Sequence, residues 1–384
     1  MKALFKIGAL VTAGVALSAG LAGCGCGGCY GCGGNSVSNR TVTNSNWFTG
    51  TSYAGIQTSF IPVADHPEYT KEEIVYEVSF DGSSASNSSY SVEYKDGTFT
   101  TEFYALSYDW SAKNIPEKYR RDESEIVYRY TTTLNVKVRY TLKKDGSASE
   151  WMDDVVVNDS YFRAAGKRLQ PVYSRQESQS SSPARRSADT LEKTYNRVNA
   201  VYENYYAYDC GEVTAYSTVN GKSAEKVHGK LNKISYSFFD NAYLYTAVRS
   251  MTLSETLTQT VTMFSGANMG TENYSVRGGR ADIPAEELKA ISAELNRVGL
   301  YHPVTKDAEG NDVEDKGVPA TAVAVNNVGS KLVGAQQIIW YASVTDPDMN
   351  TARATMLKIT APLPYNLGIL NYKLKEIKST LWNE

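Results

Sequence analysis

Residues 128–143 read YRYTTTLNVKVRYTLK and carry the clearest periodicity in the chain. Apolar and aromatic side chains, joined by one threonine, take alternate positions: Tyr128, Tyr130, Thr132, Leu134, Val136, Val138, Tyr140 and Leu142. Polar and charged side chains, among them Arg129, Lys137 and Arg139, take the positions between them. A period of two predicts a β-strand that buries one face. Held over about fifteen residues, it predicts a strand of roughly 50 Å, a length typical of strongly curved sheets and barrels.

Shorter alternating runs lie on both sides of this strand. Residues 73–80, 90–94 and 99–108 predict strands, and Lys95-Asp96-Gly97 predicts a hairpin turn between the last two. Asn220-Gly221 predicts a second hairpin, which joins residues 213–219 to residues 230–238. We expect further strands at 195–208, 320–325, 338–344, 353–360 and 367–377. The 28 tyrosines, against 10 phenylalanines, also favour antiparallel β-structure.

Residues 174–189, SRQESQSSSPARRSAD, interrupt the pattern. The segment is polar, contains Pro183 and shows no hydrophobic period, so it predicts an exposed loop that proteases would cleave at Arg185-Arg186. The alternative is a boundary between two similar halves. Residues 47–384 are therefore expected to form a β-rich body of one large domain, or of two β-halves divided near 174–189.

Two segments have a helical period instead. Residues 241–251 follow Phe239 and Asp240, which predict a hydrophobic staple and an N-cap. Residues 284–298 begin at a proline and stop at Gly299. The apolar faces of the two helices are Leu244, Ala247, Val248 and Met251 on the first and Leu288, Ile291, Leu295 and Val298 on the second. The predicted fold class is mainly β with few helices: a large curved antiparallel sheet or half-barrel packed on one or two short helices.

The first 23 residues predict a secretory signal peptide. Lys2 and Lys6 flank a short positive head, and residues 7–22 form an apolar run too short to span a bilayer comfortably. The run ends in Leu21-Ala22-Gly23-Cys24, which resembles a bacterial lipoprotein lipobox and implies cleavage before Cys24 and diacylglycerol on its thiol. A single transmembrane anchor is the alternative, but small residues dilute the run and no basic stop-transfer cluster follows. We expect an extracytoplasmic protein held on the bacterial cell membrane by lipid on Cys24, in a monoderm or a diderm host.

Residues 24–46, CGCGGCYGCGGNSVSNRTVTNSN, predict a flexible tether. Four of the five cysteines lie in it. A metal site is one interpretation of their Cys-x-x-Cys spacing. Lipidation of Cys24 leaves only Cys26, Cys29 and Cys32, however, whereas a closed zinc site takes four ligands. Because thiols of an exported protein meet oxidising conditions, these three are expected to be redox-labile or further acylated.

The charge balance excludes some partners. The signal peptide holds two of the 39 basic residues and none of the 42 acidic ones, so its removal moves the net charge from −3 to −5. A mildly acidic chain gives no electrostatic basis for binding nucleic acid. The acidic stretch 307–315 lacks the ligand alternation of a calcium loop and predicts a solvated hairpin tip. With no catalytic, metal or phosphate-binding motif, we expect no cofactor and a protein that is not an enzyme.

The order of segments resembles bacterial proteins with a lipoprotein-carrier-like half-barrel (LolA/LppX-like). Residues 156–171, with Asn158-Asp159-Ser160 and Leu169-Gln170-Pro171, look like the strand before the family's long loop. Residues 240–251 look like its short internal helix, and Trp340-Tyr341-Ala342 with residues 356–359 and 367–377 looks like its closing hairpins. The resemblance implies a curved antiparallel sheet that wraps around helices and cradles an acyl chain or another apolar ligand.

Two functions follow from these expectations. The first is a non-enzymatic lipoprotein that binds an apolar or amphipathic ligand in a groove between helix 241–251 and the strand at 128–142. The residues expected to line this groove are Tyr128, Tyr130, Val136, Val138, Leu244, Val248 and Met251. The alternative is a surface adhesion or interaction module with a Tyr-rich β face and no ligand cavity. The sequence leaves the ligand, the physiological partner and the oligomeric state open.

Overall fold

The computed structural model describes residues 71–106, 127–164, 169–207, 212–228, 239–249, 258–279, 281–303, 313–328, 336–342 and 355–379, with residues 251, 255–256, 306 and 309–311. The signal peptide, the tether and the acylation site predicted at Cys24 lie outside these residues. So do residues 229–238, where a strand is predicted.

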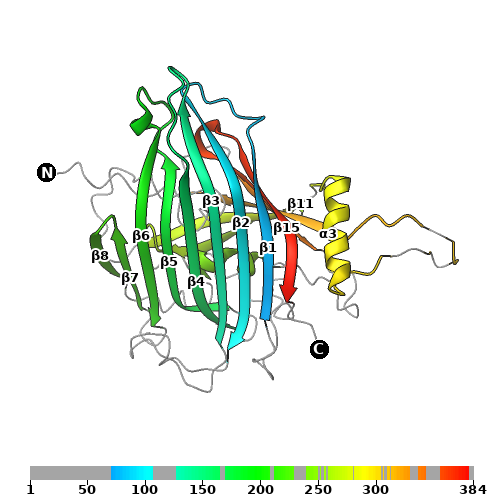
Figure 1. Ribbon diagram of the computed structural model, residues 1–384. Coiled ribbons are helices and arrows are strands. Elements are labelled where there is room, and N and C mark those ends of the chain that lie inside the picture. The colour runs from blue at the N-terminus through cyan, green and yellow to red at the C-terminus, as the bar shows by residue number, and fades with distance from the viewer. Residues whose placement is uncertain are drawn as a thin grey trace.

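The first half of the described chain is an antiparallel meander of eight strands (Figure 1). These are β1 (Lys71–Asp81), β2 (Tyr90–Leu106), β3 (Val127–Leu142), β4 (Met152–Ala164), β5 (Leu169–Pro183), β6 (Tyr195–Ala207), β7 (Glu212–Val219) and β8 (Lys222–His228). A short 3-10 helix, η7 (Leu191–Lys193), precedes β6. Each strand pairs with the next along the chain, so β8 lies at one edge of the sheet.

The second half continues the same sheet. Its elements are β9 (Phe239–Asp240), η9 (Asn241–Tyr243), α2 (Leu244–Arg249), β10 (Gln259–Ser265), β11 (Gly270–Gly279), α3 (Ala285–Arg297), β12 (Ala320–Asn327), β13 (Gln337–Ala342), β14 (Met356–Pro362), η10 (Pro364–Asn366) and β15 (Ile369–Ser379). β15 pairs with β1, which joins the halves into one sheet of 15 described strands with β9 at the far edge. All pairings are antiparallel except β9 with β10. The predicted fold class, mainly β with a large curved antiparallel sheet and short helices, is confirmed.

β3 has the predicted orientation. Tyr130, Val136 and Val138 are at most 5% exposed, whereas Lys137 on the other face is exposed. The buried side of β3 continues across β1 and β2 through Tyr76 and Phe99, whose rings lie 5.7 Å apart. We call this side the inner face of the sheet.

The sheet rolls until its second half lies against its first. The turn after β10 is so close to β6 that a Cβ on Gly266 would lie 3.1 Å from the Cβ of Tyr202. The ring of Phe264 on β10 meets that of Tyr206 on β6 edge-on at 6.1 Å. β8 and β9 are nevertheless not paired with each other, so the sheet formed by the described strands is curved but unclosed.

The two α-helices are placed differently. All six residues of α2 are buried, and Tyr245 contacts Phe99 of the inner face, so α2 fills part of the interior. α3 lies beside β14 and β15 (Figure 1): Lys358 pairs with Glu287 at 2.9 Å, and the carboxylate of Glu294 accepts the backbone N–H of Ile377 at 2.6 Å. Helix 284–298 is confirmed within one residue at each end. The other predicted helix is shorter than expected, because residues 241–243 form a 3-10 turn and α2 ends at Arg249.

Two turn predictions are wrong in detail. Lys95-Asp96-Gly97 is not a hairpin: β2 runs through it, and Asp96 and Gly97 form a bulge opposite Val136. Glycine is required there because a Cβ would lie 2.6 Å from the Cβ of Val78. Asn220-Gly221 is a hairpin turn, with both φ angles positive, but it leads directly into β8 instead of into residues 230–238.

The predicted exposed loop at 174–189 is also wrong over most of its length. Residues 169–183 form β5, paired with β4 on one side and β6 on the other. Pro183 is the last residue of the strand and lies beyond Gln179, where the pairing with β4 ends, so one side of the strand is an edge there and tolerates a missing N–H. Only the connection at 184–190 is largely exposed, including Arg185 and Arg186.

Candidate functional site

The inner face of the sheet changes from apolar to polar between β3 and β5. On β5, every second residue from Ser174 to Ser182 is polar and buried. On β4, Asp154 and Asn158 are buried on the same side. We call five of these residues, each at most 6% exposed, the inner polar patch: Asp154, Asn158, Gln176, Ser178 and Ser180.

Strand register makes the patch continuous. Asn158 of β4 lies directly opposite Gln176 of β5, and Val156 lies opposite Ser178. Since directly opposed side chains in antiparallel strands start about 5 Å apart, the five residues form two adjacent columns. Asn158 is also tied to β3, because its Nδ2 donates to Oγ1 of Thr132 at 3.0 Å.

Each patch residue has a buried polar atom without a hydrogen-bond partner in the protein. These atoms are Oδ2 of Asp154, Oδ1 of Asn158, Nε2 of Gln176, Oγ of Ser178 and Oγ of Ser180. A buried polar group left unpaired costs about 1–3 kcal/mol. Five of them would cost about 5–15 kcal/mol, as much as the whole stability of a typical domain. Such groups are normally satisfied by water or by a ligand, so the patch is suited to receive polar atoms that the protein does not supply.

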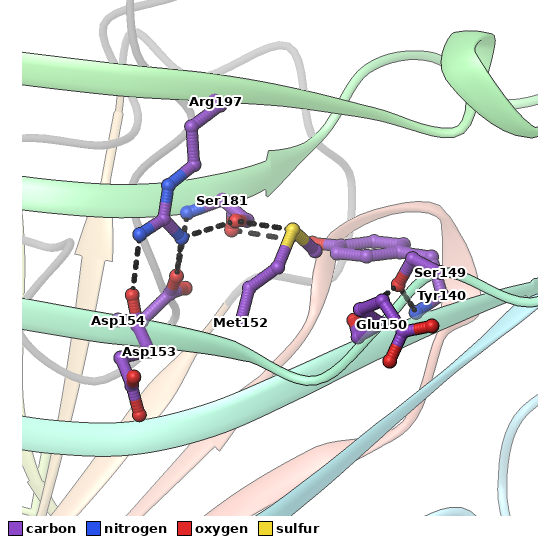
Figure 2. Close-up of polar contacts among 8 residues, drawn as sticks. All are labelled: Tyr140, Ser149, Glu150, Met152, Asp153, Asp154, Ser181 and Arg197. Carbon is purple, nitrogen blue, oxygen red and sulfur yellow. Dashed lines mark hydrogen bonds and ion pairs between the residues drawn. The ribbon is translucent and has the colours of Figure 1, made fainter.

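An ion pair lies at one end of the patch, and Figure 2 shows its members, Arg197 and Asp154. Nη1 of Arg197 on β6 donates to Oδ1 of Asp154 at 2.8 Å, and the backbone N–H of Ser181 donates to the same oxygen at 2.9 Å. Nη2 of Arg197 donates to the carbonyl of Asp153 at 2.6 Å. The guanidinium thus bridges β6 and β4 beyond Val155 and Gln179, the pair at which the backbone pairing of β4 with β5 ends.

Burial raises the pKa of Asp154 to about 7, although Ser181 and Arg197 favour the carboxylate. The carboxyl group is therefore partly protonated near neutral pH. When protonated it can donate a hydrogen bond, and when ionised it can only accept.

The ligand-lining residues expected from the sequence lie beside this patch. Four are on the inner face of β3 and three are on or just after α2, and all are at most 6% exposed: Tyr128, Tyr130, Val136, Val138, Leu244, Val248 and Met251. They belong to one continuous cluster of buried apolar residues. The structure thus brings the predicted residues together, with β4 as the border between their apolar surroundings and the polar patch.

Sequence reasoning missed the polar half of this surface. At 174–182 the two faces of β5 differ in size and charge, not in hydropathy. Small or uncharged side chains point inward, whereas Arg175, Glu177 and Gln179 point outward. An alternation of small and large polar residues is the signal that could have identified the strand.

Asp240 forms a second buried polar cluster, which joins the two halves of the rolled sheet. Its carboxylate on β9 accepts hydrogen bonds from Ser174, Asn204 and Tyr206 on β5 and β6. It also caps η9 by accepting the backbone N–H of Ala242 at 2.8 Å, which confirms the predicted N-cap. Burial raises the pKa of Asp240 above its ordinary value. This cluster holds the far edge in place.

A buried ion pair ties α2 to β1. Arg249 donates to both carboxylate oxygens of Glu72, at 2.6 and 3.1 Å, and both side chains are less than 9% exposed. A bidentate pair of this kind fixes the orientation of the helix inside the sheet.

The outer face carries a row of tyrosines across four strands. The rings of Tyr161, Tyr173, Tyr205 and Tyr216 follow one another at centroid distances of 5.9, 5.0 and 5.8 Å. The first three are only 3–8% exposed. The row therefore does not present these three rings as an open contact surface.

A groove of about 1020 Å³ lies between α3 and the segment that precedes β12. Its walls include Leu288, Lys289, Tyr301 and Glu314. It is separate from the inner polar patch, with which it shares no lining residue.

The described residues contain no group of three or more His, Cys, Asp and Glu side chains that could hold a metal ion. In the same part of the chain, neither α-helix has the length and apolar character needed to cross a membrane.

Comparison with known proteins finds similarity among solved structures. No protein-family model and no curated protein matches the chain. Among solved structures, it is similar to the crystal structure of a β-barrel-like protein of a domain of unknown function, DUF1849, from Brucella abortus. The two chains are 9% identical with a TM-score of 0.39, over 80% of this chain and 97% of the other.

Proposed function

We propose that this protein is a non-enzymatic, extracytoplasmic lipoprotein that binds an amphipathic ligand inside its rolled sheet. The apolar part of the ligand lies along the inner face of β3 and against α2. The polar part lies on the inner polar patch. The acyl group on Cys24 anchors the protein to the membrane, and residues 24–46 tether the sheet to that anchor.

The proposal rests on one observation. Five buried polar residues with unpartnered atoms adjoin a continuous apolar surface on the same face of one sheet. A protein that only needed a stable core would gain nothing from this arrangement, because each unpaired group costs free energy. An amphipathic ligand satisfies both halves of the surface at once, since its chain buries apolar area and its polar group completes the hydrogen bonds. The resemblance to LolA/LppX-like half-barrel proteins, which implies a cradled acyl chain, agrees with it.

The adhesion alternative has weaker support. It requires an exposed aromatic face, whereas three of the four tyrosines in the outer row are buried. The unpartnered polar atoms lie on the opposite, inner face of the sheet, where a protein partner would have to enter the roll.

Binding can be tested on the predicted mature chain, residues 24–384, purified without detergent. Native mass spectrometry of the folded protein should show a co-purified molecule of a few hundred daltons or, after extraction with solvent, uptake of a C12 amphiphile at a ratio of one to one. A chain that carries nothing and takes up no amphiphile while its melting transition stays cooperative would refute the proposal.

A further inference from the structure

We propose that the ligand's polar group is an uncharged, hydroxyl-rich headgroup of about disaccharide size, bound by Asn158, Gln176, Ser178 and Ser180. This inference rests on the proposed function and specifies its ligand class. It is argued from the chemistry of the patch, from the charges around it and from its length.

The patch offers donors and acceptors in mixed order. Oδ1 of Asn158 accepts and Nε2 of Gln176 donates, and the hydroxyls of Ser178 and Ser180 do both. A phosphate or carboxylate group offers acceptors alone, and an ammonium group offers donors alone. Hydroxyl groups both donate and accept, so a hydroxyl-rich group can satisfy a mixed set without leaving an atom unpaired.

The described strands that form and flank the patch supply no free countercharge for an anion. No lysine or arginine is among the inward-facing described residues of β3, β4, β5 and β6. Arg197, which contacts the patch at Asp154, already donates to that carboxylate, to Oγ of Ser181 and to the carbonyl of Asp153. A buried anion without a partner charge is costly, and an ionised Asp154 would add repulsion.

A cationic headgroup fits no better. Asp154 is the one carboxylate in the patch, and its charge is already offset by Arg197 at 2.8 Å. An ammonium group placed there would form a buried triad with two positive members, which leaves one charge uncompensated.

The length of the patch sets the size of the headgroup. From Asn158 to Asp154 the strand advances by four residues, or about 13 Å at a rise of roughly 3.3 Å per residue. A single hydroxyl or a glycerol unit covers one row of the patch. A disaccharide reaches across all of it.

The test compares three amphiphiles with alkyl chains of nearly the same length, below their micelle concentrations: dodecyl maltoside, dodecylphosphocholine and lauric acid. Affinities for the chain 24–384 are measured by calorimetry or equilibrium dialysis. We expect dodecyl maltoside to bind at least about tenfold more tightly than the other two, because a charged headgroup leaves some of the buried groups unpaired. Maltose without a chain should bind far more weakly than dodecyl maltoside.

A double variant and a matched control test whether the patch residues bind the headgroup. Asn158→Leu combined with Gln176→Leu should weaken dodecyl maltoside binding about tenfold or more, while lauric acid binding stays the same or improves. Gln176→Leu removes an unpaired buried donor and should not lower the melting temperature, whereas Asn158→Leu also breaks the hydrogen bond to Thr132. The melting transition of the double variant should therefore fall by no more than that of Asn158→Leu alone and stay cooperative. Gln179→Leu, on the outward side of the same strand, is the matched control and should change neither affinity.

The outcomes distinguish the headgroup inference from the proposed function. Equal affinity for the three amphiphiles, or a double variant that binds dodecyl maltoside like the parent, overturns the headgroup inference and leaves the amphiphile-binding function standing. Failure of all three to bind overturns both.

Discussion

Replacing Asp154 with Asn should remove a pH dependence of stability that the buried carboxyl group imposes. Asp154 is 0% exposed, and its Oδ1 accepts from Ser181 and Arg197, contacts that an asparagine Oδ1 can keep. What the substitution removes is the proton that the carboxyl group binds in the folded state.

The sign and size of the effect follow from the pKa. Burial raises the pKa of Asp154 to about 7 in the folded protein, whereas an aspartate in an unfolded chain has a pKa of about 3.9. The neutral form is thus favoured by folding, so its stabilising contribution is full below the unfolded pKa and is lost as the pH rises through about 7. The slope is about 1.4 kcal/mol per pH unit between the two pKa values, and the loss from pH 5 to pH 8 is about 3 kcal/mol.

The assay is urea unfolding of the chain 24–384 at pH 5, 6, 7 and 8. Burial also raises the pKa of Asp240 and of Glu272, so the parent has other sources of pH dependence besides Asp154. The difference in pH dependence between parent and Asp154→Asn isolates that contribution. Asp153→Asn, whose side chain is exposed on the neighbouring residue, should follow the parent. Parallel pH profiles for the parent and Asp154→Asn would refute the reasoning.

Three further predictions test the register, the junction of the halves and the anchor. Val138→Asp places an unpaired carboxylate in the core and should destabilise the protein by about 3 kcal/mol or more in urea unfolding. Lys137→Gln, on the exposed side of the same strand, should cost under about 0.5 kcal/mol. Equal costs for the two variants would contradict the register. Asp240→Ala deprives several buried donors of their acceptor and should lower the free energy of unfolding by about 3 kcal/mol or more. Asp189→Ala, at an exposed aspartate, should leave it almost unchanged. A small loss of stability for Asp240→Ala would mean that the junction of the two halves is held by packing alone. Cys24→Ser should leave unprocessed precursor or release the protein into the soluble fraction, and normal processing with detergent-phase partitioning of that variant would exclude acylation at this residue.

Much of the fold could be predicted because one face of most strands is apolar. β3 shows this most clearly, since its inward side is apolar but for one threonine and its outward side carries charges, so a period of two reveals both the strand and its register. α3 was predictable from the proline at its start, Gly299 after its end and a regular apolar face between them. α2 is different: its apolar face located the helix, but its whole circumference is buried, including Thr246 and Arg249, so the pattern did not mark its ends.

The candidate site was only half predictable, and for a physical reason. Hydropathy locates surfaces that are buried because they are apolar, so the sequence indicated the inner face of β3 and one side of helix 241–251. β5 is buried although both of its faces are polar, because its backbone is paired on both sides and the roll of the sheet covers its inner face. The pattern of polar and apolar residues within a single strand does not indicate how the whole sheet rolls.

The neighbours of the patch show that polarity at these positions is not forced by the fold. Val156 lies between Asp154 and Asn158 on the inner face of β4, and Ala200 on β6 lies opposite Ser178. Both are fully or nearly fully buried, so the same rows of the sheet accommodate apolar side chains. Valine or leucine in place of Gln176 would add apolar burial and remove an unpaired donor, and both changes favour the folded state. Where a protein has a residue that is less stabilising than another that would fit, function is expected to have determined that residue. This applies to the inner polar patch and not to the larger apolar cluster beside it, so the patch is the stronger evidence for a binding site.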